Sequence, residues 1–199
     1  MGTLLSKPTT SENPEVDLIG ARLGERSIAL VGLMGAGKTS IGRRLARDLG
    51  LPFHDTDEEI EAVSRMTVTE LFAAYGEPEF RALETRVVGR LAREGPSVIA
   101  TGGGAFINEQ TRELLHEASI TVWLRAELDI LMERVTRRST RPLLKTPNPR
   151  ATMQGLMEQR YPIYAQADIT VESREAPRET IAREVALAVA AYLSGEVTK

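Results

Sequence analysis

Apolar and polar residues alternate in blocks along the 199-residue chain, and the blocks have two different periods. Short runs that are almost wholly apolar, such as SIALV, are typical of strands buried on both faces of a parallel sheet. Longer stretches with apolar residues three or four positions apart are typical of helices that bury one face. The runs predict strands at Ser27–Val31, Leu51–His54, Ser97–Thr101, Ile120–Leu124 and Ile169–Glu172. The longer stretches predict helices at Thr39–Leu49, through most of 58–93, and at Arg178–Leu193.

Strands and helices that alternate in this way predict an α/β fold, with three α/β/α layers built on a five-stranded, doubly wound parallel sheet. Two segments do not match that core: a helical insert at about residues 58–93 and a basic, proline-bearing stretch at about 136–150. Because ligands of such folds bind at the carboxyl ends of the strands, we expect both segments to be mobile flaps over a site there. Residues 1–26 are polar and are predicted to be a flexible leader, which leaves 27–199 as a single domain.

The segment after the first predicted strand matches a phosphate-binding loop. Gly32–Thr39 reads GLMGAGKT, which fits G-x-x-x-x-G-K-[ST] between a strand and a helix. Glycines let successive N–H groups turn toward phosphate oxygens, the lysine adds a full charge, and the threonine hydroxyl can ligate Mg²⁺. The pattern arises by chance in roughly 1 of 100 chains of this length, and its place between strand and helix lowers that about tenfold. The sequence therefore predicts a P-loop kinase that binds ATP and Mg²⁺ through Gly35, Ala36, Gly37, Lys38, Thr39 and Ser40.

Two aspartates, Asp55 and Asp57, follow the second predicted strand. If the backbone stays extended, both carboxylates face the P-loop, where one could hold Mg²⁺ through water and the other could meet the acceptor hydroxyl. The segment DTDEE is equally typical of a helix N-terminus. Spacing alone does not decide between these interpretations. Both hold if Thr56 or Asp57 lies near the cap while Asp55 faces the metal.

Glycines and arginines mark two further places. Gly102, Gly103 and Gly104 follow the third strand, where they either let a ligand approach bare backbone amides or form a tight turn. The stretch 136–150 has five cationic residues and no acidic one. It has no interleaved aromatic residues and the chain has a net charge of −3, so a lid that closes over polyphosphate explains it better than an RNA-binding patch.

Composition excludes several classes of protein. The chain has no cysteine, which excludes disulfides, thiolate metal sites and cysteine nucleophiles. No apolar run approaches the ~20 residues of a membrane-spanning helix, so no membrane partner is expected. The pI near 5.6 argues against a nucleic-acid partner.

Taken together, GLMGAGKT, DTD, EFR, GGGA, RPLL and QRYPIY, in this order and at these intervals, resemble the shikimate kinase family from about Ser27 to Leu193. The resemblance implies a nucleoside-monophosphate-kinase-like fold in which residues 58–93 bind substrate and 136–150 form the lid. It also implies a cytoplasmic monomer that uses ATP and Mg²⁺ to phosphorylate the 3-hydroxyl of shikimate in aromatic amino-acid biosynthesis. Two other hypotheses stay open: a P-loop kinase for another small polyol or hydroxy acid such as gluconate, and an inactive relative that only binds a partner.

The resemblance also implies roles for single residues. Catalysis is expected from Lys38, Asp57 and Arg141, with Mg²⁺ at Thr39 and Asp55. Arg134 and Arg141 are expected at the nucleotide. An adenine-flanking arginine aligns ambiguously with Arg174 or Arg178. The residues expected at shikimate are Asp57, Phe80, Arg81, Gly102, Gly103, Gly104 and Arg160.

Overall fold

The fold is a parallel sheet between helical layers, as a computed structural model of residues 13–136 and 146–196 describes it. The strand order is β2-β3-β1-β4-β5, and every neighbouring pair is parallel. The strands are β1 (Ser27–Val31), β2 (Phe53–Asp55), β3 (Val98–Ala100), β4 (Ser119–Arg125) and β5 (Ile169–Glu172). The predicted α/β class and five-stranded parallel sheet are confirmed.

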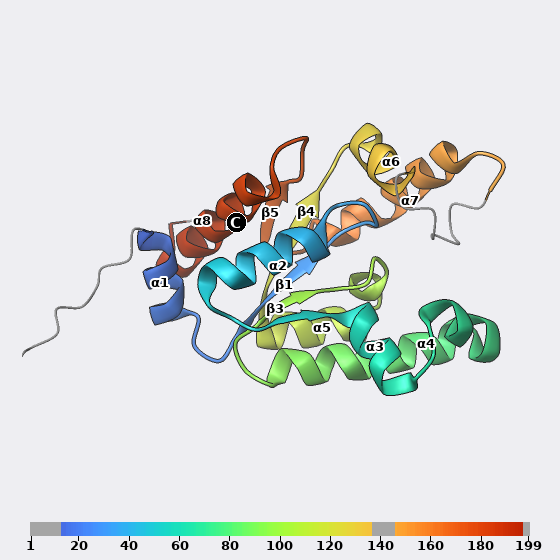
Figure 1. Cartoon of the computed structure of the whole chain (residues 1–199), viewed down its shortest axis with the longest axis horizontal. Helices are drawn as coiled ribbons and strands as arrows, with labels where there is room; N and C mark the ends of the chain where they lie inside the picture. The colour runs from blue at the N-terminus through green and yellow to red at the C-terminus, as the bar shows by residue number, and fades with distance from the viewer. Residues whose placement is uncertain (1–12, 137–145, 197–199) are drawn as a thin grey trace, which may run out of the picture.

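Helices cover both faces of the sheet (Figure 1). On one face, α2 (Lys38–Leu49) packs against α8 (Arg178–Ser194). On the other, α4 (Val68–Arg93) packs against α5 (Glu109–Ala118). Every residue of β1 is buried, as expected for a central strand covered on both faces.

Part of the predicted flexible leader is a helix. α1 (Pro14–Arg22) packs against α8, with Ile19 only 1% exposed. Leu23, four positions later, is also buried. Two apolar residues at this spacing form one helical face, and the proline at the first turn suits a helix start. The expectation of flexibility is therefore wrong for residues 14–22, while residues 1–12 lie outside the described part.

The predicted insert is two helices, and its second half belongs to the core. α3 (Thr56–Ser64) is followed by α4, which is interrupted at Gly76, where φ is 81° and ψ is 175°. Beyond this kink Val87, Val88 and Leu91 are buried against the body of the domain. The expectation that all of 58–93 lies outside the core is wrong here, because these residues form an apolar face along α4.

The second flap falls mostly outside the described residues. Residues 137–145, which include Arg141, are among those the structure does not describe. Before them comes α6 (Leu128–Thr136), and after them α7 (Pro149–Tyr164) begins with Asn148 as its cap. A short 3₁₀ turn, η1 (Ala105–Ile107), completes the elements. Across the described ranges, each helix is too short or too polar to traverse a bilayer.

Candidate active site

The P-loop runs from the carboxyl end of β1 into α2. Gly35 and Gly37 have φ values of 84° and 94°, a backbone conformation that side chains disfavour. A Cβ added to Gly35 would lie 3.0 Å from Val135 Cγ1 and 3.1 Å from the carbonyl oxygen of Leu131. Glycine at this position therefore gives the loop its curvature and lets α6 pack closely against it.

Lys38 directs its ammonium group into the P-loop. The side chain is 8% exposed, and Nζ donates to the carbonyl oxygens of Gly32 and Leu33 at 2.7 and 2.9 Å. Its positive charge is thus held among backbone groups where phosphate oxygens bind in loops of this type.

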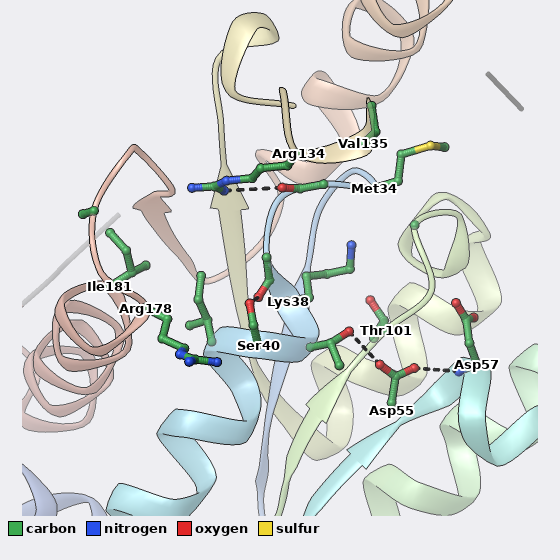
Figure 2. A pocket seen from close by; sticks show the side chains of 16 residues that line it. Met34, Lys38, Ser40, Asp55, Asp57, Thr101, Arg134, Val135, Arg178 and Ile181 are labelled. Carbon is green, nitrogen blue, oxygen red and sulfur yellow. Dashed lines mark hydrogen bonds between the residues drawn. The ribbon is translucent and has the colours of Figure 1, made fainter. Parts of the chain in front are cut away.

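A cavity of about 320 Å³ opens beside the P-loop (Figure 2). It brings together most of the residues predicted at the nucleotide, both predicted metal ligands and the predicted base. Its lining includes Gly35, Gly37, Lys38, Thr39, Ser40, Asp55, Asp57, Gly103, Arg134 and Arg178.

Asp55 caps α3 and also contacts the P-loop. Its Oδ1 accepts a hydrogen bond from the amide of Asp57 at 3.1 Å, which makes Asp55 the N-cap of α3. Its Oδ2 accepts from the Thr39 hydroxyl at 2.7 Å. Asp55 itself is the cap, and Thr56 and Asp57 are the first two residues of α3, so the helix N-terminus is the interpretation that describes this backbone.

The Thr39 hydroxyl and the Asp55 carboxylate fit a magnesium ion. Mg²⁺ prefers oxygen ligands, and it is commonly held by one or two carboxylates, waters and substrate phosphates. Within the described ranges no three His, Asp or Glu side chains form a cluster that could hold a metal alone. A hydroxyl and a carboxylate beside a phosphate loop therefore match a nucleotide-bound ion.

Asp57 faces a second carboxylate, that of Glu84, which the sequence reasoning missed. A Cβ on Gly102 would lie 2.9 Å from Asp57 Oδ1 and 2.7 Å from Glu84 Oε1, so the two acids meet at this glycine. Glu84 is 1% exposed, and burial raises its pKa, against the effect of the nearby Arg81 guanidinium. The signal was available: Glu84 stands three residues after Arg81 on one helix face.

Arg81 is held between two acids of its own helix. Its Nη1 lies 2.6 Å from Glu84 Oε2 and its Nη2 lies 3.1 Å from Glu77 Oε1. The guanidinium also crowds Gly104, where an added Cβ would lie 2.5 Å from Nη2. Phe80 is 3% exposed and packs on Phe72 at 4.4 Å between ring centroids, so it supports this helix turn from inside.

Arg160 reaches the glycine triplet from α7. Its Nη1 donates to the carbonyl oxygen of Gly103 at 3.1 Å, and the Tyr164 hydroxyl donates to the same oxygen. Arg81 and Arg160 are not part of the cavity lining, but they contact Gly104 and Gly103, and Gly103 does line the cavity.

Arg134 lies at the other end of the cavity and joins two loops. It donates to the Gly35 carbonyl at 3.3 Å, to Ser173 Oγ at 2.8 Å and to the Arg174 carbonyl at 2.7 Å. Burial lowers the pKa of its guanidinium. Figure 2 shows this side chain at the P-loop.

The two arginines that the sequence could not distinguish point in different directions. Arg178 lines the cavity, in the same wall as Ser40 (Figure 2). Arg174 instead pairs with Glu184 on α8, with Nη1 2.7 Å from Oε2.

Comparison with known proteins gives this site its family. The shikimate kinase family model matches residues 34–190. A shikimate kinase from Rhizobium leguminosarum bv. trifolii is 62% identical over 169 residues, which are 85% of this chain and 86% of the relative. The chain belongs to the shikimate kinase family. It is accordingly an ATP-dependent phosphotransferase that acts on an alcohol group.

Solved structures agree with the shikimate kinase assignment. The shikimate kinase from Acinetobacter baumannii in complex with shikimate has a TM-score of 0.80 at 36% identity, covering 87% of this chain and 96% of that one. A gluconokinase from Sinorhizobium meliloti 1021 has a TM-score of 0.55 at 25% identity, covering 86% of this chain and 95% of that one. Both the TM-score and the sequence identity are higher for the shikimate kinase than for the gluconokinase. The comparison therefore favours the shikimate hypothesis over the gluconate hypothesis.

Proposed function

We propose that the chain transfers the γ-phosphoryl group of ATP–Mg²⁺ to the 3-hydroxyl of shikimate, in the cavity between the P-loop and Asp57. One observation carries the proposal: Lys38, Thr39, Asp55 and Asp57 line a single cavity, although the P-loop and the acidic pair come from different strands. Gly103 lines the same cavity, Arg160 donates to its carbonyl, and Arg81 lies against the neighbouring Gly104.

The nucleotide is proposed to bind along the P-loop, with Gly35, Ala36, Gly37, Lys38, Thr39 and Ser40 around its phosphates. Thr39 and Asp55 would hold Mg²⁺, which supplies charge neutralisation on the β- and γ-phosphates when bound. Arg134 and Arg178 are proposed beside the adenosine, because both line the cavity and Figure 2 shows both guanidinium groups on the other side of Lys38 from Asp57. Arg141 lies outside the described residues, and its role at the transferring phosphate stays a prediction.

The acceptor is proposed to bind between Asp57 and the two arginines. Arg81 and Arg160 carry the charge that would pair with the shikimate carboxylate, and a guanidinium matches a carboxylate bidentately. Phe80 supports Arg81 from the core, while Gly102, Gly103 and Gly104 form the floor between the arginines. Asp57 orients the 3-hydroxyl and accepts its proton as the oxygen bonds to phosphorus and the bond to ADP breaks.

A coupled ADP-release assay with shikimate and gluconate as alternative acceptors tests the reaction. We expect turnover with shikimate, and Asp57→Asn is expected to lower kcat at least ~10²-fold while calorimetry still detects ATP binding. Glu58→Gln is the matched control, since Glu58 is the next residue of α3 but pairs with Arg43 on the surface. Transfer to gluconate alone would overturn the acceptor, and ATP binding without any turnover would support the inactive-relative hypothesis. Wild-type kcat in Asp57→Asn would remove Asp57 from the chemistry.

A further inference from the structure

The carbonyl oxygen of Gly103 accepts hydrogen bonds from two side chains of α7 that lie one helical turn apart. One donor is Arg160, through Nη1 at 3.1 Å, and the other is the Tyr164 hydroxyl. Gly103 also faces the P-loop, since an added Cβ would lie 3.4 Å from the amide nitrogen of Met34. This carbonyl therefore joins α7 to the triplet at the point where the triplet meets the phosphate loop.

Tyr164 lies in the core, and its hydroxyl donates to the Gly103 carbonyl. The residue is 1% exposed, and its ring stacks between Phe106 and Trp123, with centroids 6.4 and 6.1 Å away. Burial raises the pKa of the hydroxyl to about 12, so it remains a hydrogen-bond donor at any pH where the enzyme works. The mechanism proposed above makes no use of it.

Arg160 has two tasks, and its guanidinium has five N–H groups with which to carry them out. In the structure it donates to the Gly103 carbonyl, whereas the proposed acceptor site requires its guanidinium on the substrate carboxylate. Gly103 is partly buried, and a carbonyl in such a place is destabilised when it loses a donor that water does not replace. The Tyr164 hydroxyl can keep that carbonyl bonded when Arg160 turns to the substrate.

A hydrogen bond to the Gly103 carbonyl also orients the peptide group that follows it. The peptide unit is planar, so holding the Gly103 oxygen also fixes the direction of the Gly104 amide. Gly104 lies against the Arg81 guanidinium. Tyr164 thus holds the Gly103–Gly104 backbone, which Arg160 contacts at Gly103 and Arg81 contacts at Gly104.

We propose that Tyr164 is a positioning residue for the acceptor: its hydroxyl holds the Gly103 carbonyl, which keeps the glycine triplet in place and releases Arg160 to bind the substrate anion. The proposal rests on the acceptor site proposed for Gly103 and Arg160.

The test compares Tyr164→Phe with Tyr161→Phe. Both changes remove one hydroxyl from the same helix, and both hydroxyls donate to a backbone carbonyl, but Tyr161 donates to Ala126, away from the triplet. We expect Tyr164→Phe to raise KM and the calorimetric Kd for shikimate roughly threefold to tenfold, the usual range for one neutral hydrogen bond. KM for ATP should stay within twofold, and Tyr161→Phe should keep the wild-type shikimate values. A shikimate Kd unchanged in Tyr164→Phe, or raised equally in both variants, overturns the proposal, whatever the melting temperatures are.

A second comparison separates this inference from the proposed acceptor site. If Arg160→Ala leaves the shikimate Kd unchanged, the acceptor site itself is wrong. If Arg160→Ala weakens binding while Tyr164→Phe does not, only the role of Tyr164 fails. If Tyr164 acts by releasing Arg160, its substitution should weaken binding less in the Arg160→Ala background than in the wild type. Equal effects in the two backgrounds would refute the release of Arg160.

Discussion

Replacing Arg81 with methionine is expected to leave Glu84 as a buried acid without its nearest cation. Glu84 is 1% exposed, and its Oε2 lies 2.6 Å from Arg81 Nη1. Asp57, which meets Glu84 at Gly102, adds a second negative charge close by. Methionine keeps most of the apolar length of the arginine stem, so the change removes chiefly the charge and its hydrogen bonds.

The destabilisation has an upper limit set by protonation of Glu84. An ordinary glutamate has a pKa near 4.3, and each pH unit above it costs about 1.36 kcal/mol to keep the group neutral. A neutral Glu84 in the folded variant therefore costs at most about 3.7 kcal/mol at pH 7 and about 1 kcal/mol at pH 5. Since burial already raises the pKa of Glu84 in the wild type, its contribution to stability is greatest below pH 4 and declines as the pH rises toward neutrality. The variant should make this decline steeper.

Thermal unfolding followed by circular dichroism at pH 5 and pH 7 measures the effect. At about 2–4 °C per kcal/mol for a domain of this size, we expect Arg81→Met to lose up to roughly 7–15 °C at pH 7 and about 2–4 °C at pH 5. In Arg81→Met combined with Glu84→Gln, the loss of melting temperature relative to Glu84→Gln alone should be the same at both pH values. Arg90→Met is the control, because Arg90 lies on the same helix but pairs with the more exposed Glu59 and Glu94. An equal loss at both pH values in Arg81→Met would refute this account of Glu84.

Substitutions of Asp55 and Arg178 test the nucleotide end of the cavity. Asp55→Asn keeps a good helix cap but replaces the carboxylate beside Thr39, so it should raise the Mg²⁺ concentration needed for half-maximal activity at least about tenfold; an unchanged Mg²⁺ titration would place the metal elsewhere. Arg178→Ala should raise KM for ATP severalfold while Arg174→Ala leaves it unchanged, because only Arg178 lines the cavity; the opposite pattern in steady-state kinetics would assign the nucleotide contact to Arg174.

The sequence predicted the sheet well because strand burial is visible in it. β1 and β5 have the predicted ends, since apolar runs stop where the strands stop. β2 was predicted at Leu51–His54 and lies at Phe53–Asp55. The polar side chain of Asp55 is typical of a loop, although its backbone pairs with Ala100 in the sheet. The helix at α1 was missed for a related reason: its apolar face is short and consists of Val16, Ile19 and Leu23 in a largely polar segment.

The sequence predicted those residues of the candidate site that belong to short local motifs. The P-loop, Asp55 and Asp57 were found because their spacing carries the chemistry, and they do share one cavity. The spacing of Glu84 from Arg81 indicates their ion pair, but the meeting of Glu84 with Asp57 at Gly102 and the bond of Tyr164 to Gly103 depend on contacts far apart in the chain. No periodicity indicates that a tyrosine of α7 will donate to a glycine after β3.

The glycine triplet shows how such contacts decide a residue type. The sequence left two interpretations, a bare backbone for a ligand and a tight turn, yet none of the three glycines has a positive φ that would require glycine. Glycine is favoured at Gly102 and Gly104 because side chains of the protein itself lie against the backbone there. A Cβ at Gly102 would lie within 3 Å of both Asp57 and Glu84, and one at Gly104 would lie within 3 Å of the Arg81 guanidinium. Glycine is needed there because acidic and basic side chains from α3 and α4 converge on one stretch of backbone, so alanine at either position should displace a side chain of the proposed acceptor site even with no ligand bound.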